Sequence, residues 1–256
     1  MQTENSIEGP QGSVHFISAG EGGLPSLFVH SFGGSAMHWI NQIYHLQKSR
    51  LVIAIDLRGH GKSKLPANGD FSPDGLADDI AAVVDSFNLH QFILVGHSMG
   101  GAAAIAYAGK HPERVAGLVL AGTPGKSDPK QAAQIVNSLK SEKYNEVMKD
   151  YMNQLLMHAK PEVDIEVRSE FNQLPEKTTI DIIETIFNYD PTPSLQVYEG
   201  PVLIIATQHE ADGPSSLSKQ FPSIREEIVS GTSHWIQLDK PEEFNRILDE
   251  FTEQIK

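Results

Sequence analysis

The sequence has no cysteine, few basic residues and no long hydrophobic run. Because cysteine is absent, the chain can form no disulfide framework, no thiolate nucleophile and no cysteine-ligated zinc or iron–sulfur cluster. Only 20 Lys and Arg residues stand against 33 Asp and Glu residues, and the net charge is −13. This charge argues against nucleic acid or an anionic membrane as a partner, since both need clustered basic side chains.

Two further absences concern membranes and secretion. The apolar runs reach only about seven residues, whereas ~20 are needed to span a bilayer. The N-terminal segment MQTENSIEGPQG has neither the basic start nor the apolar core of a signal peptide. We therefore expect a cytoplasmic protein, and its 256 residues are enough for one large domain or for one domain with an insertion.

Short apolar runs alternate with amphipathic helical patterns along most of the chain. Each run is bounded by small or polar residues, as in parallel strands that helices cover on both faces. The predicted strands are Ser26–His30, Leu51–Ile55, Phe92–Gly96, Gly117–Ala121 and Val202–Ala206, with weaker candidates at Val14–Ile17 and Glu226–Val229. The alternation predicts an α/β fold with a doubly wound, mostly parallel sheet.

The alternation is interrupted once, between Thr123 and Leu195. This stretch contains at least three helical patterns and no convincing buried strand. Within it, Pro161–Leu174 shows strand-like alternation as well, so helix and strand both stay open there. We expect residues 1–123 and 196–256 to form the core, and residues 124–195 to be a helical insertion before the penultimate strands.

One motif carries chemistry by itself. Gly96-His97-Ser98-Met99-Gly100 fits G-x-S-x-G and lies between a predicted strand and an alanine-rich helix. In this context the pattern is the nucleophile elbow, a sharp turn that needs small residues beside the serine. The turn exposes the serine hydroxyl above the sheet, where the next amide and the helix N-terminus favour negative charge. Ser98 is therefore the predicted nucleophile.

Five more motifs occur in the order found in the α/β-hydrolase superfamily, which the chain resembles over nearly its whole length. They are His30-Ser31-Phe32-Gly33-Gly34, Asp56-Leu57-Arg58-Gly59-His60-Gly61-Lys62-Ser63, His111–Val115, Pro201–Ile205 and Ser233-His234-Trp235. The resemblance implies a serine hydrolase of the esterase or enol-lactone hydrolase-like branch, with residues 124–195 as a helical cap, or lid. It also implies an oxyanion hole formed by the backbone N–H groups of Phe32 and Met99.

The resemblance further implies a catalytic triad that runs Ser, then Asp or Glu, then His. His234 is the predicted base, because a neutral imidazole can take the serine proton and return it to the leaving group. The family's acid turn is G-x-x-D, but here it reads Thr207-Gln208-His209-Glu210-Ala211-Asp212. Glu210 falls in the register of the acid and is the first choice. Asp212 is the second choice, and an acid elsewhere or no acid stays open.

Other polar residues beside the motifs are expected to be structural. Ser31 replaces the usual glycine of the H-G turn, which affects the conformation of that turn more than its amide donors. His30 and His97 are expected to pack and to support turns. Asp56, Arg58 and His60 are expected to stabilise their own turn through hydrogen bonds to its backbone.

The motifs together predict two-step acyl transfer, in which Ser98 attacks a carbonyl and water then releases the acid. A small carboxylic ester is the default substrate. A lactone, or a C–C bond cleaved by the same triad, is the alternative. A non-catalytic ligand-binding receptor on the same scaffold is the alternative from another class, favoured only by the altered acid turn. We expect no metal, no organic cofactor, no nucleic-acid partner and no membrane partner; the oligomeric state is not indicated.

Overall fold

The computed structural model of the protein describes residues 2–66 and 69–255. Within these residues, eight strands form one sheet in the order β1-β2-β4-β3-β5-β6-β7-β8. The strands are β1 (Thr3–Gly9), β2 (Gly12–Ala19), β3 (Ser26–Val29), β4 (Val52–Ile55), β5 (Phe92–His97), β6 (Val115–Ala121), β7 (Val202–Ala206) and β8 (Arg225–Ile228). β2 pairs antiparallel with β1 and β4, and all other neighbours are parallel. The predicted mostly parallel α/β fold is confirmed.

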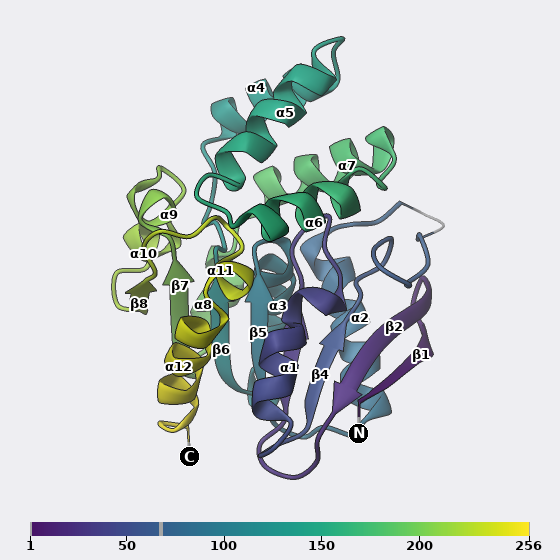
Figure 1. The fold of residues 1–256 in the computed structure, drawn as a ribbon, viewed down its shortest axis with the longest axis vertical. Helices are drawn as coiled ribbons and strands as arrows, with labels where there is room; N and C mark the ends of the chain where they lie inside the picture. The colour runs from purple at the N-terminus through teal and green to yellow at the C-terminus, as the bar shows by residue number, and fades with distance from the viewer. Residues whose placement is uncertain (1, 67–68, 256) are drawn as a thin grey trace.

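Helices lie on both faces of this sheet (Figure 1). The helices of the described residues are η1 (Ala36–Trp39), α1 (Ile40–Leu46), α2 (Pro73–Ser86), α3 (Met99–Lys110), η2 (Pro112–Arg114), α4 (Pro129–Leu139), α5 (Tyr144–Leu155), α6 (Pro161–Phe171), α7 (Glu176–Asn188), α8 (Thr192–Val197), α9 (Gln208–Asp212), α10 (Leu217–Gln220), α11 (Ile236–Asp239) and α12 (Pro241–Thr252). One buried apolar cluster joins the sheet to α1 and α12, and a second joins it to α2 and α3. The sheet is therefore the middle of three layers, as expected for a doubly wound fold.

The helix α2 illustrates how local sequence sets these elements. The Ser72 side chain accepts a hydrogen bond from the Gly75 amide at 3.0 Å, and Pro73 occupies the first turn. Both features favour a helix start. The spacing of Leu76, Ile80 and the residues one turn further places an apolar stripe on the face that packs on the sheet.

The strand β1 was not predicted from the sequence. Its side chains are mostly exposed, and it pairs with β2 through a tight reversal in which Gly9 faces Gly12. An antiparallel strand at the edge of a sheet buries little apolar surface, so it needs no apolar run. The pattern that identifies buried parallel strands is therefore absent from residues 3–9.

The helices α4, α5, α6 and α7 follow β6 and lie beyond the carboxyl ends of the parallel strands (Figure 1). The ambiguous segment is helical in α6: Val163, Val167 and Phe171 are buried at four-residue spacing, whereas Ile165 is 69% exposed. The expected boundary at residues 195 and 196 falls inside α8, which contacts α3 of the core. The division into core and cap stays a prediction.

No helix in the described part of the chain is both long enough and apolar enough to cross a membrane.

Candidate active site

Ser98 lies at the turn between β5 and α3, in a backbone conformation that residues other than glycine rarely adopt. Its φ is 52° and its ψ is −112°. The turn is compact: a β-carbon on Gly100 would lie 2.4 Å from the carbonyl oxygen of His30, and one on Gly101 would lie 1.9 Å from Thr123 Oγ1. Such strain persists where the surroundings enforce it, and it is frequent at active sites. Met99 is the first residue of α3, so its amide has no acceptor within the helix.

His234 and Glu210 form the contact expected of a base and its acid. Nδ1 of His234 contacts Oε1 of Glu210 directly. A carboxylate at this nitrogen favours the tautomer that carries the proton on Nδ1, which leaves Nε2 able to accept a proton. A β-carbon on Gly122, where φ is 50°, would lie 2.9 Å from Cε1 of His234, so the histidine packs against this glycine.

The acid turn has a helix N-cap at the position where the family has glycine. Thr207 is the N-cap of α9, and its hydroxyl accepts from the Glu210 amide at 3.2 Å. In return, Oε2 of Glu210 accepts from the Thr207 amide at 2.8 Å. This reciprocal pair is the capping box T-x-x-E. One carboxylate oxygen therefore holds the helix start, and the other faces His234. The T-x-x-E spacing is the sequence signal that could have separated Glu210 from Asp212.

Asp212 is placed differently. Its carboxylate accepts from Gln208 Nε2 at 2.9 Å, and the residue is exposed at the end of α9. It is not among the residues that line the cavity above Ser98. The structure thus brings Glu210 and not Asp212 to His234.

Electrostatics keep the Glu210 carboxylate ionised. Burial by itself raises the pKa of Glu210, but the charge and hydrogen bond of His234 and the hydrogen bonds of Thr207 outweigh it. The pKa of Glu210 is therefore lowered from its ordinary value. An ionised carboxylate at Nδ1 stabilises the imidazolium that forms when His234 accepts a proton.

Ser98, Glu210, His234 and Phe32 line one cavity of about 230 Å³. Apolar side chains from the insertion and from the segment after α9 form much of its remaining wall: Tyr151, Leu155, Ile186, Phe187 and Leu217. Neither lysine nor arginine occurs among its lining residues in the described part of the chain. A few polar groups on an apolar cavity are typical of a site for a small organic molecule.

The turn that carries Phe32 is held by His30. Nδ1–H of His30 donates to the Ser31 carbonyl at 2.7 Å, and Nε2 accepts from the Leu57 amide at 3.0 Å. The Ser31 hydroxyl is buried and has no hydrogen-bond partner among the described residues. The side chain of Ser31, which replaces the usual glycine, therefore contributes no hydrogen bond to this turn among the described residues. The Phe32 ring lies 4.7 Å from the ring of Phe171 in α6.

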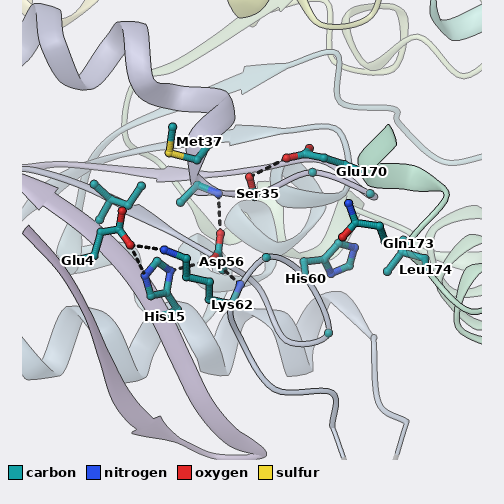
Figure 2. Close-up of a pocket in the computed structure, with 16 residues that line it drawn as sticks. Glu4, His15, Ser35, Met37, Asp56, His60, Lys62, Glu170, Gln173 and Leu174 are labelled. Atoms are coloured by element: carbon teal, nitrogen blue, oxygen red, sulfur yellow. Dashed lines mark hydrogen bonds and ion pairs between the residues drawn. The ribbon is translucent and has the colours of Figure 1, made fainter. Parts of the chain in front are cut away.

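Asp56 supports more than its own turn. Its Oδ2 accepts from the Lys62 amide at 2.9 Å and from His15 Nδ1 at 2.8 Å, and its Oδ1 accepts from the Ala36 amide at 2.6 Å. Asp56 lines a hollow of about 290 Å³. Figure 2 shows it there with His15 and Lys62. Because Ala36 closely follows Phe32, this carboxylate fixes the segment after the expected oxyanion turn. The sequence expectation for Asp56 was therefore incomplete.

His97 is hydrogen-bonded as well as packed. Its Nε2–H donates to the carbonyl of His234 at 2.9 Å, and its Nδ1 accepts from Gln237 Nε2 at 3.1 Å. The ring is fully buried. Burial and then the neighbouring charge of His234 hold the pKa of His97 well below its ordinary value, so the ring is neutral.

One group of described side chains offers three ligand atoms within 4.8 Å of one another, as a metal site does: His38, Glu166 and Glu170. Nε2 of His38 already lies 2.6 Å from Oε2 of Glu170, and Ser35 Oγ donates to Oε1 at 3.2 Å. The group does not line the cavity above Ser98. The contacts of this group connect α6 to η1. The expectation of no metal stays a prediction.

A serine of this conformation after the central strand of such a sheet is the architecture of the α/β hydrolases. The chain belongs to this family, whose model, described as alpha/beta hydrolase fold, matches residues 27–241. The fold and family expected from the sequence are thus confirmed.

Two curated relatives and one solved structure illustrate the likeness. A 2-hydroxymuconate semialdehyde hydrolase of Pseudomonas sp. (strain CF600) is 41% identical over 110 residues, 42% of this chain and 39% of that protein. The 3-oxoadipate enol-lactonase 2 of Acinetobacter baylyi is 27% identical over 249 residues, 93% of this chain and 92% of that protein. A thermophilic esterase from Thermogutta terrifontis is 23% identical with a TM-score of 0.83, covering 99% of both chains, which shows the fold alone.

Identity is concentrated in part of the chain. Two curated relatives above 40% identity match over only 30% and 39% of their own length.

We expect three buried histidines to make the protein less stable in acid. Burial lowers the pKa of His30 and His97, and it lowers the pKa of His60 to about 3. Unfolded histidines bind protons near pH 6.5. As pH falls below about 6.5, these histidines bind protons in the unfolded state but not in the folded state. The free energy of unfolding therefore falls, by up to about 1.4 kcal/mol per pH unit for each histidine.

Urea unfolding at pH 7.5 and pH 5.5 measures this loss. We expect His60→Gln to reduce the difference between the two unfolding free energies. The control is His90→Gln, because His90 is exposed and should leave the difference unchanged. Equal pH dependence in wild type and His60→Gln would show that His60 does not contribute.

Proposed function

We propose that this protein is a serine hydrolase that cleaves a small, uncharged carboxylic ester through an acyl-enzyme on Ser98. One observation carries the proposal: the strained elbow serine and the His234–Glu210 pair line the same apolar cavity. A nucleophile, a base and an orienting acid around a space for substrate are the parts that acyl transfer requires.

The mechanism follows from the roles of these groups. Nε2 of His234 takes the proton of Ser98 as Oγ attacks the ester carbonyl, and Glu210 stabilises the imidazolium. The amides of Phe32 and Met99 donate to the oxyanion of the tetrahedral intermediate, a contribution of about 3–4 kcal/mol for each such donor. The imidazolium then protonates the leaving alcohol. Water, activated by the same histidine, releases the acid and regenerates Ser98.

The lining of the cavity supports an uncharged substrate. Apart from histidines and Tyr151, its ionisable side chains are Glu210 and Glu226, both acidic. A carboxylate on the substrate would lose its hydration against apolar side chains and meet no lysine or arginine among the described lining residues. Burying an unpaired charge is costly. A neutral acyl chain in contact with Leu155, Ile186 and Phe187 avoids this cost.

A matched pair of esters tests this charge preference. We expect kcat/KM for p-nitrophenyl pentanoate to exceed that for mono-p-nitrophenyl glutarate by at least about 100-fold, or about 2.7 kcal/mol. The two acyl chains have the same number of carbons and differ in the terminal carboxylate. Glu226→Gln should narrow the difference, because it removes a negative charge from the wall. Equal kcat/KM values for the two esters would contradict the proposal of an uncharged substrate.

A lactone is the second candidate substrate, because opening a lactone uses the same nucleophile and base. The enol-lactonase relative, which aligns over most of this chain, favours it. Turnover of a neutral lactone panel and of neutral esters by one preparation separates the two. C–C bond cleavage uses the same triad and is tested in parallel. Absence of turnover on every panel would favour the receptor alternative.

The proposed reaction needs neither a metal ion nor an organic cofactor. The cytoplasmic location, and the absence of nucleic-acid and membrane partners, remain proposals that rest on charge and composition.

A further inference from the structure

The loop that carries His234 is attached to a buried carboxylate outside the triad. Asp239, the last residue of α11, is 2% exposed. Its Oδ2 accepts from the amide of Ser233 at 2.8 Å and from the Ser233 hydroxyl at 2.5 Å. Burial of a carboxylate is tolerated when hydrogen bonds compensate it. These bonds fix the residue immediately before His234.

The other oxygen of the same carboxylate reaches the insertion. Oδ1 of Asp239 accepts from the amide of Lys160 at 2.8 Å. Lys160 is the N-cap residue of α6, at the end of the segment that connects α5 to α6. Asp239 therefore bridges the base loop and this connection, and it lies 79 positions from Lys160 along the chain.

A second bond joins the same two segments. The amide of His234 donates to the carbonyl of Leu155 at 2.9 Å, and Leu155 is the last residue of α5. On its other side, the His234 carbonyl accepts from His97. Both polar backbone groups of His234 are thus hydrogen-bonded, and one of the two partners belongs to the insertion.

We propose that Asp239 is a positioning residue that couples the connection between α5 and α6 to the catalytic base. The inference rests on the proposed function of His234. The imidazole is aligned with Ser98 only while residues 155–160 hold the base loop in place. The insertion then contributes to chemistry as well as to the wall of the cavity, since Leu155 also lines the space above Ser98.

The variant Asp239→Asn tests the bridge. An amide has one oxygen, so its NH₂ group would face either the Lys160 amide or the Ser233 amide, both of which are donors. One of the two attachments is therefore lost. We expect kcat on p-nitrophenyl pentanoate to fall by about 10- to 100-fold, with KM changed less than about threefold, because small misplacements of a catalytic group have effects of this size.

The variant Lys160→Pro removes only the donor on the insertion side. Lys160 has φ −62°, which proline adopts without strain. We expect kcat to fall here too, and we expect faster amide hydrogen exchange in residues 230–236 although Ser233 keeps its own bonds to Asp239. Unchanged kcat and unchanged exchange in Lys160→Pro would overturn the coupling, even if Asp239→Asn does not fold.

The control is Tyr198→Phe. Its hydroxyl donates to the carbonyl of Val115 at 3.0 Å, at the start of β6 and far from the carboxyl end where Ser98 lies. This variant loses a buried hydrogen bond, so its melting temperature should fall while its kcat stays unchanged. If wild type hydrolyses no ester, the proposed function fails. The exchange measurement still decides the coupling, because it needs no turnover.

Discussion

Ser98→Ala is expected to lower ester turnover by about 10⁴- to 10⁶-fold, because removal of the nucleophile leaves only binding and the oxyanion donors. The hydroxyl is held by a backbone in which φ is 52°, and no second serine in the described chain shares that conformation. The neighbouring amides survive the change, so the protein should fold and bind substrate as before.

Initial rates with p-nitrophenyl butyrate provide the measurement, and a fluorophosphonate probe gives an independent one. Mass spectrometry should find one labelled serine in wild type and none in Ser98→Ala. Ser86→Ala is the matched control, because Ser86 ends α2 and its hydroxyl donates to the Val83 carbonyl, away from the cavity above Ser98. Similar rates for wild type and Ser98→Ala would remove the serine hydrolase proposal.

Glu210→Gln is expected to lower kcat by about 10³- to 10⁴-fold, the size seen when an orienting carboxylate is replaced by its amide. A glutamine cannot stabilise the imidazolium, and its NH₂ group favours the wrong tautomer of His234. Glutamine also serves in a capping box, so the start of α9 at Thr207 should survive. The loss should therefore appear in kcat with little change in melting temperature.

Asp212→Asn is the matched control for this change. It alters a carboxylate two positions away that bonds Gln208 and does not contact His234. We expect its kcat to stay within about twofold of wild type, as for a surface substitution away from the site. Loss of activity in Asp212→Asn with a fully active Glu210→Gln would reverse the assignment of the acid.

Much of the fold could be predicted because buried parallel strands and amphipathic helices leave local patterns. The runs at Phe92–Gly96 and Val202–Ala206 each became a strand of the sheet. The strand β1 could not be found in this way, since an exposed edge strand needs no apolar run. The segment at Pro161–Leu174 stayed ambiguous because alternation and four-residue spacing coincide in it. The segment is a helix in the structure because this conformation buries both Val163 and Val167.

The candidate site also has one part that local sequence patterns indicate and one part that only the tertiary structure shows. By itself, the sequence determined the family and predicted Ser98 as the nucleophile, because an elbow turn depends on residues adjacent in the chain and its glycines are visible there. Only the tertiary structure decided which carboxylate faces His234, and only it revealed the bonds of His97 and Asp239 to the base loop. Those contacts join segments that are far apart in the sequence, and their distances are set by how the helices pack on the sheet. No local pattern records such distances.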